Sequence, residues 1–154
     1  MALGSNLPFW PALIFTYLEP LSYILGWNQA FNTPTEFILT QTPSTLSSKV
    51  TPVHPNAILV SYAFANVLLV MTGLVILCTV VTREARVTKT FLFILGCGDL
   101  GHLWGWYRGL GADVFWDYNA YNLSLWANIA FTVFLVVNRA ATLLGLFGRI
   151  GRRA

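Results

Sequence analysis

Four long apolar stretches, separated by polar segments, dominate the pattern of the chain. They cover about residues 8–27, 56–81, 88–107 and 121–147. A helix needs roughly 20 apolar residues to cross the hydrocarbon core of a bilayer, and each stretch is long enough to do so. We therefore predict an all-α fold, a four-helix transmembrane bundle that forms a single transmembrane domain over residues 1–154.

The first stretch is the least regular of the four. Pro11, Glu19 and Pro20 interrupt its apolar run. Prolines are tolerated in membrane helices where neighbouring groups satisfy the freed carbonyls. A signal peptide would have a basic start and an uninterrupted apolar run, and this stretch has neither. We therefore interpret it as a retained membrane segment.

The connecting segments predict which way the bundle faces. Residues 28–55 form a long outer loop rich in Thr, Ser, Pro and Asn, whereas the connector 82–89 and the tail with Arg149, Arg152 and Arg153 are basic. Two helices separate that connector from the tail, so both lie on the same side of the membrane. Basic residues favour the cytosolic side. Both termini are then predicted to be cytosolic.

The composition agrees with a membrane environment and excludes other classes of protein. Hydrophobic residues make up 56% of the chain and charged residues only 10%, against about 25% charged residues in soluble domains. The basic residues cluster at the ends of apolar runs instead of forming a patch for nucleic acid. We expect an integral membrane protein, located in the endoplasmic reticulum, with the lipid bilayer as its surroundings and no nucleic-acid partner.

A few ionisable side chains fall inside the apolar stretches. Glu19 lies near the middle of the first, and Arg139 lies in the fourth. Asp99 and His102 share one face of the third, because they are three residues apart. A charge at the bilayer centre costs about 2.5–3.5 kcal/mol on insertion scales, so several at this depth indicate a function.

Each of these residues also has a purely structural interpretation. Glu19 could be a protonated carboxyl group bonded to another helix, and Asp99 and His102 could bond each other. Arg139 could reach the headgroups or neutralise a buried carboxylate. We leave these alternatives open at this stage.

Polar stripes on membrane helices must turn away from lipid. We therefore expect one inward-facing cavity with apolar and aromatic walls, on which the following residues converge: Glu19, Asn66, Asp99, His102 and Asn128. The candidate catalytic residues are Glu19, Asp99 and His102. The candidate substrate-binding residues are Tyr17, Tyr23, Asn66, Trp106, Asn128 and Arg139.

Such a cavity suits a lipophilic small molecule that carries one polar group. Burial favours the protonated form of a carboxylic acid, and a protonated acid can transfer its proton to an alkene or epoxide. Aromatic faces stabilise the cation that results. The sequence contains no histidine pair for haem and no nucleotide-binding fingerprint, so we expect no cofactor and no metal.

Small residues recur along the third stretch, at Gly101, Gly105 and Gly109. Such spacing lets another helix approach closely. This face therefore permits a homo-oligomer of the chain.

Three short motifs carry a resemblance to a known family: Leu18-Glu19-Pro20, the stretch from Gly98 to Trp106, and Asn138-Arg139. They resemble a family of small fungal four-span membrane proteins of unknown function, and the resemblance covers most of the chain. In architecture the chain is also similar to the emopamil-binding protein and sigma-2 receptor group, which binds or isomerises sterols. It resembles more loosely the integral membrane terpene cyclases of fungal meroterpenoid pathways, in secondary metabolism.

These resemblances and the buried ionisable groups together predict a membrane enzyme that isomerises or cyclises a terpenoid- or sterol-like substrate. Glu19 or Asp99 would donate a proton, and His102 would orient or relay it. The alternative is a non-catalytic membrane protein that binds a hydrophobic ligand or a partner helix. A channel or transporter subunit fits less well, because the chain has no repeat of matched broken helices.

Overall fold

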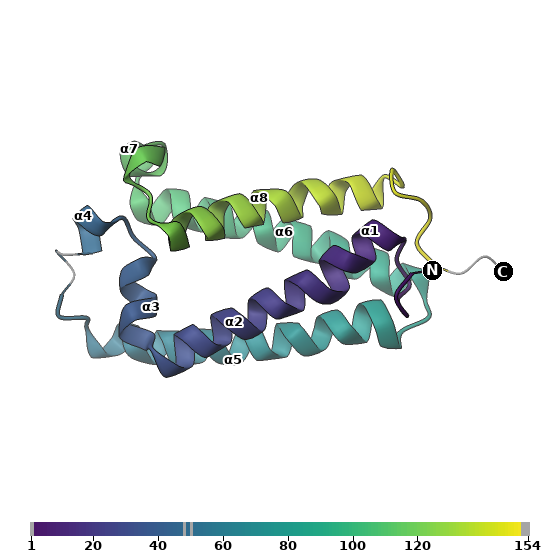
Figure 1. Ribbon diagram of the computed structural model, residues 1–154, viewed down its shortest axis with the longest axis horizontal. Coiled ribbons are helices and arrows are strands. Elements are labelled where there is room, and N and C mark those ends of the chain that lie inside the picture. Colours follow the sequence, from purple (N-terminus) through teal and green to yellow (C-terminus); the bar gives the residue numbers. More distant parts are fainter. Residues whose placement is uncertain (1, 48, 50, 152–154) are drawn as a thin grey trace.

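The structure is a bundle of helices. The computed structural model describes residues 2–47, 49 and 51–151, and every regular element in that part of the chain is a helix (Figure 1). Arg152 and Arg153 of the basic tail lie outside the described residues. The prediction of an all-α fold is confirmed.

Long helical rods lie roughly side by side along the molecule (Figure 1). The first combines α1 (Phe9–Ala12), the π-helix η1 (Leu13–Leu18) and α2 (Glu19–Asn32), and the second combines α5 (Pro55–Ile76) with the π-helix η2 (Leu77–Val81). The others are α6 (Ala85–Leu110) and α8 (Leu123–Leu143). Shorter helices fill the connectors: α3 (Pro34–Thr40), α4 (Ser44–Ser47), α7 (Ala112–Phe115) and the 3-10 helix η3 (Tyr118–Ala120).

The ends of the helices differ from the predicted ranges for local reasons. The first rod continues to Asn32, and α3 begins at Pro34 within the segment predicted as a loop. Proline is well placed at the first position of a helix, where its missing N–H has no partner to lose. At the other end of the chain, α8 stops at Leu143, because Gly145 adopts a φ of 81° that ends the helix.

Among the residues that the structure describes, two helices, Pro55–Val81 and Leu123–Leu143, are long and apolar enough to cross a membrane. These two helices suggest a membrane protein. The first rod and α6 are of similar length but carry ionisable residues in their middles, which lowers their hydropathy: Glu19 in the former, and Asp99 and His102 in the latter.

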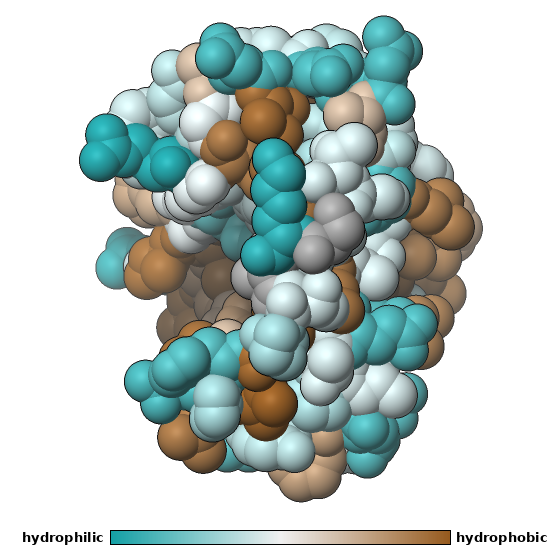
Figure 2. Space-filling model, turned by 90° about the vertical axis from the view of Figure 1, so that its left-hand side faces the viewer, coloured by the Kyte–Doolittle hydropathy of each residue, from teal (hydrophilic) through white to brown (hydrophobic). Residues whose placement is uncertain are grey.

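The long helices associate as two pairs. The first pair consists of the rod Phe9–Asn32 and the rod Pro55–Val81, and the second pair consists of α6 and α8. Contacts between the pairs concentrate at the end that holds both termini. Seen from the opposite end, the surface has a brown, apolar hollow at mid-height (Figure 2).

Proline explains the π-helical stretch in the first rod. Pro20 has no N–H, and its ring crowds the carbonyl of Thr16, four residues earlier. The chain adopts the wider π turn just before this point, and the N–H of Glu19 bonds the carbonyl of Ile14. The hydroxyl of Thr16 then donates to that of Thr79 in η2 at 3.2 Å. The π turns of the first pair thus meet each other directly beside Glu19.

The N-terminal segment closes one end of the bundle through Asn6, which is 3% exposed. Its backbone N–H donates to the carbonyl of Thr79 at 2.8 Å, and its side-chain Nδ2 donates to the carbonyl of Thr82 at 2.7 Å. Its own carbonyl accepts from the N–H of Gly151 at 2.9 Å. The last carbonyls of a helix have no partner within it, and Asn6 supplies one. The two ends of the described chain and the connector after η2 therefore lie together.

Contact between the rods of the first pair depends on Gly26. A Cβ atom at this position would lie 3.0 Å from Cδ1 of Leu68 on α5. We expect Gly26→Val to lower the free energy of unfolding by about 1–3 kcal/mol, the usual cost of overpacking. Thermal unfolding of the purified protein in detergent would measure this loss.

Gly73 provides the matched control, because a Cβ atom there meets nothing within 4 Å. We expect Gly73→Val to change the stability by no more than about 0.5 kcal/mol. Equal losses in the two variants would contradict close packing at Gly26.

Candidate functional site

A buried ionic network joins the two helix pairs. Arg139 on α8 donates from Nη2 to Oε1 of Glu19 on α2 and from Nη1 to Oδ2 of Asp99 on α6. The side chains of Arg139 and Glu19 are 1% and 0% exposed, and that of Asp99 is 15% exposed. The guanidinium therefore lies between two carboxylates inside the bundle and does not reach out towards headgroups.

Neighbouring side chains hold this network in place. Tyr23, one turn along α2, donates its hydroxyl to Oε1 of Glu19 at 2.5 Å. The ring of Phe15 lies with its centroid 5.2 Å from Cζ of Arg139, a cation–π contact. Gly96 on α6 lies beside the arginine: a Cβ atom there would make an ordinary van der Waals contact with Cδ of Arg139, at 3.8 Å.

Phe15 was not among the predicted site residues. Its spacing of four residues from Glu19 places both on one face of the helix, and this is the signal that could have indicated it. Trp10 was missed as well: its Nε1 donates to Oδ1 of Asn138 at 2.9 Å. That contact depends on the packing of α1 against α8, which no local pattern specifies.

Two polar atoms of the network have no partner among the described residues. They are Oε2 of Glu19 and Nε of Arg139, and both are buried. Oε1 of Glu19, by contrast, accepts from both Tyr23 and Arg139. Leaving a buried polar group unpaired is costly, so this asymmetry requires a physical explanation.

His102 lies outside the network and is exposed on α6. Its Nε2 accepts a hydrogen bond from Nε1 of Trp106 at 2.9 Å. Asp99, three residues earlier, is turned towards Arg139 instead. Mutual bonding of Asp99 and His102, one of the structural interpretations, is therefore not the arrangement found.

His102 and Trp106 line a groove of about 560 Å³ along α6. We call it the α6 groove; its full lining is Gln41, Thr42, Gly101, His102, Gly105, Trp106, Gly109 and Leu110. A Cβ atom on any of its three glycines would meet nothing within 4 Å. The glycine face predicted for helix pairing is thus open, and it forms part of this groove.

A second groove, of about 480 Å³, runs between α2 and α8. We call it the α2–α8 groove; its lining is Leu18, Leu21, Ser22, Leu25, Ala127, Asn128 and Phe131. Nδ2 of Asn128 donates to Oε1 of Gln41 at 3.0 Å, and Gln41 lines the α6 groove. One side-chain hydrogen bond therefore connects the linings of the two grooves.

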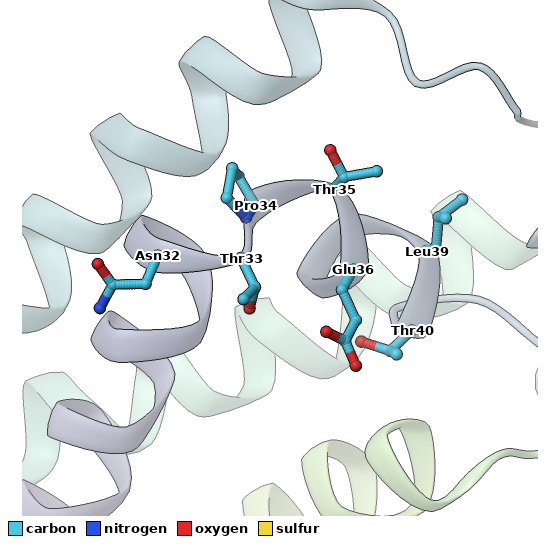
Figure 3. Close-up of a pocket in the computed structure, with 7 residues that line it drawn as sticks. All are labelled: Asn32, Thr33, Pro34, Thr35, Glu36, Leu39 and Thr40. Atoms are coloured by element: carbon cyan, nitrogen blue, oxygen red, sulfur yellow. The ribbon is translucent and has the colours of Figure 1, made fainter.

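A third groove, of about 470 Å³, lies at the elbow between α2 and α3 (Figure 3). The side chains of Glu36 and Thr40 extend towards the same side of this elbow (Figure 3). Its lining residues are Asn32, Thr33, Pro34, Thr35, Glu36, Leu39 and Thr40. None of these residues was a predicted site residue, and none belongs to the network of Glu19, Arg139 and Asp99.

The expectation that the predicted polar residues converge on a single cavity is wrong in its geometry. The structure unites Glu19 and Asp99 through Arg139, but it places His102 in the α6 groove and Asn128 in the α2–α8 groove. Asn66 lies exposed on α5, whose face towards the bundle carries the buried Ala65 one position earlier. Each residue turns a helix face by about 100°, so neighbouring positions point in different directions.

Tyr17 is likewise not brought to the network. Its side chain is 49% exposed, and its hydroxyl donates to the carbonyl of Leu3 at 2.9 Å.

Within the described part of the chain, no group of three or more His, Cys, Asp or Glu side chains could hold a metal ion. The carboxyl groups of Glu19 and Asp99 and the imidazole of His102 can take part in proton transfer and hydrogen bonding.

Comparison with known proteins identifies one family. Residues 4–149 match the family described as Domain of unknown function (DUF7704). No curated protein and no solved structure matches the chain. None of these comparisons links it to the emopamil-binding protein group or to the terpene cyclases. The match includes all the long helices and every residue of the buried network, and the chain belongs to the DUF7704 family.

Proposed function

We propose that the chain is a four-span membrane enzyme that isomerises or cyclises a lipophilic, terpenoid- or sterol-like molecule by acid–base chemistry. The observation that carries the proposal is the ionic network of Glu19, Arg139 and Asp99, buried between two helix pairs and accompanied by two apolar grooves. Buried ionisable groups near a pocket with apolar walls are typical of functional sites.

Four crossings are supported by the lengths of the rods and by the placement of the charges. At about 1.5 Å per residue, α6 is roughly 39 Å long, which exceeds a hydrocarbon core of about 30 Å. The ionisable residues of the first rod and α6 reduce their apolar character, but Glu19 and Asp99 pair with Arg139 inside the bundle. These two carboxylates do not have to face lipid.

The orientation follows from the end of the bundle that Asn6 closes. The connector after η2 and the start of α6 carry Arg83, Arg86 and Lys89, and Arg149 precedes the C-terminal end of the described chain. Hydrogen bonds of Asn6 to Thr82 and Gly151 bring these segments together. By the preference of basic residues for the cytosol, we place this end, with both termini, on the cytosolic side of the endoplasmic reticulum membrane.

The two grooves suit the substrate class. The surface of both grooves is mainly apolar. Polar side chains lie at Gln41, Thr42 and His102 in the α6 groove, and at Ser22 and Asn128 in the α2–α8 groove. Volumes of about 480–560 Å³ fall within the range of small-molecule sites. A hydrocarbon skeleton with one hydroxyl, alkene or epoxide group fits this lining.

The reaction requires only a proton. A carboxylic acid of the network would add its proton to one carbon of an alkene, or to the oxygen of an epoxide, and a cation would form. In an isomerisation, a base such as His102 would remove a proton from a neighbouring carbon, so that the double bond shifts. In a cyclisation, a second alkene of the substrate would attack the cation and close the ring, and the base would then remove a proton from a carbon beside the new cation. The numbers of atoms and electrons are unchanged, and no oxidant or reductant is consumed.

One observation favours the second candidate, non-catalytic binding of a hydrophobic ligand. Neither groove is lined by Glu19 or Asp99, and both carboxylates are engaged by Arg139. In this alternative the network fastens the helix pairs together, and the α6 groove alone recognises the ligand.

Substitution of the three candidate catalytic residues separates the two functions. With squalene epoxide as the probe and protein in lipid nanodiscs, we expect Glu19→Gln, Asp99→Asn and His102→Ala each to lower product formation about 100-fold or more, the usual contribution of an acid or base. Gas chromatography with mass spectrometry measures the product, and circular dichroism checks that each variant is folded.

Matched controls use exposed residues of the same types. Glu36→Gln, Asp113→Asn and His54→Ala change the same chemical groups outside the network and both grooves, and we expect the wild-type rate from each. If the wild-type protein retains the probe and forms no product, the enzymatic function is refuted and the binding function stands.

A further inference from the structure

The buried network has an unequal number of charges. Two carboxyl groups, those of Glu19 and Asp99, face one guanidinium, that of Arg139. If both carboxyl groups were ionised, one uncompensated negative charge would remain among side chains that are 0–15% exposed. An isolated buried charge is far more costly than a buried neutral group, so an additional positive charge is required.

The hydrogen bonds show where that charge belongs. Oε1 of Glu19 accepts from two donors, whereas Oε2 of the same carboxyl group has no partner among the described residues. An ionised carboxylate shares its charge over both oxygens, so an Oε2 without donors would be strongly disfavoured. A protonated Oε2 leaves Oε1 as the carbonyl oxygen, which accepts both bonds. Asp99, which is the more exposed of the two, keeps its charge beside Nη1 of Arg139.

We infer that Glu19 stores a proton on Oε2, and that the network of Tyr23, Glu19, Arg139 and Asp99 is a proton-binding site within the bundle. This inference rests on the membrane placement in the proposed function, but it requires no reaction. Glu19 is then the group with a proton to transfer, and Asp99 is the anion that balances the charge of Arg139.

Other titratable groups near Glu19 are few. Tyr23 lies on its own helix, Asp99 on α6 and Arg139 on α8. The facing rod of the first pair carries Tyr62, which is 38% exposed, and Cys78, whose backbone carbonyl accepts from Thr88. Within these helices, Arg139 is therefore the one permanent cation at Glu19.

The proton on Glu19 also affects the stability of the contact between the two helix pairs. Glu19 belongs to the first pair, and Asp99 and Arg139 belong to the second. Loss of the proton would leave two anions on one guanidinium at the contact between the pairs. The protonated state is therefore the one in which the pairs fit closely.

Infrared spectroscopy of the full chain in lipid nanodiscs tests the inference at neutral pH. A protonated carboxyl group gives a carbonyl-stretching band that is separate from those of carboxylates and amides. We expect this band in the wild-type protein. We expect it to shift when glutamate is labelled with heavy carbon in the side-chain carboxyl group, and to stay in place when aspartate is labelled in the same way.

Two variants complete the test. Glu19→Gln should abolish the band, whereas Glu36→Gln, at an exposed position on α3, should retain it. The absence of a band in the wild-type protein, a shift with labelled aspartate alone, or a band that survives Glu19→Gln would each overturn the inference. The labelling needs no variant, so it decides the matter even if Glu19→Gln fails to fold. The presence of the band does not depend on whether the protein converts squalene epoxide. This inference and the proposed reaction can therefore fail separately.

Discussion

Replacement of Arg139 by methionine is expected to lower the free energy of unfolding by about 3–5 kcal/mol, the cost of breaking a buried ion pair by removing one partner. Arg139 is 1% exposed and is bonded to both Glu19 and Asp99. Without the guanidinium, the charge of at least one carboxylate remains buried and unpaired. Chemical or thermal unfolding in detergent measures the loss.

A triple variant distinguishes charge from packing. Arg139→Met combined with Glu19→Gln and Asp99→Asn removes all charges of the network while approximately keeping its volume. Replacing a whole buried ionic group with neutral side chains is often close to neutral for stability, so we expect the triple variant to recover most of the loss. If it is as unstable as Arg139→Met alone, the arginine acts through its packing on Phe15 and Gly96, and the electrostatic explanation is wrong.

The second large effect is expected at Asn6. Asn6→Ala removes the side-chain donor to the carbonyl of Thr82 and to the hydroxyl of Thr88, which lie at 2.7 and 3.3 Å. Leaving buried groups unpaired costs about 1–3 kcal/mol each. We expect a loss of this size in the free energy of unfolding, together with faster proteolysis at the connector after η2. Limited proteolysis followed by mass spectrometry locates the cleavage.

Asn32→Ala is the control for this substitution. Asn32 is exposed, and its Nδ2 donates to Oδ1 of Asn28 at 2.8 Å on the surface of α2. We expect its removal to change the stability by no more than about 0.5 kcal/mol. If Asn6→Ala is equally harmless, the N-terminal segment does not fasten the end of the bundle.

Both predictions concern residues whose role depends on partners far away in the sequence. Glu19 and Asp99 stood out in the sequence because charges are rare in apolar stretches, and spacing within the helix placed Tyr23 beside Glu19. Asn6 did not stand out, because a polar residue before a helix is ordinary. Its partner Thr82 is 76 positions away, and only packing brings the two together.

The same limit explains the error about a single cavity. On α8 the predicted site residue Arg139 is buried, and so are Thr132 and Thr142 on the same helix. On α5 and α6, periodicity alone could not say which face meets a neighbour. Two pairs, with few contacts between them away from the termini, leave Asn66 and His102 exposed. An evenly packed bundle of four would have covered more of these faces.

The sequence by itself determined the all-helical fold, the approximate helix ranges, and the presence of ionisable residues inside apolar helices. These properties depend on composition and on local spacing, which each segment carries within itself. Tertiary structure decided that Arg139 lies between the carboxyl groups of Glu19 and Asp99, that Gln41 connects with Asn128, and that Asn6 closes one end. These contacts arise from the way the helices pair, and a hydrogen bond or an ion pair forms only where pairing brings donor and acceptor within reach.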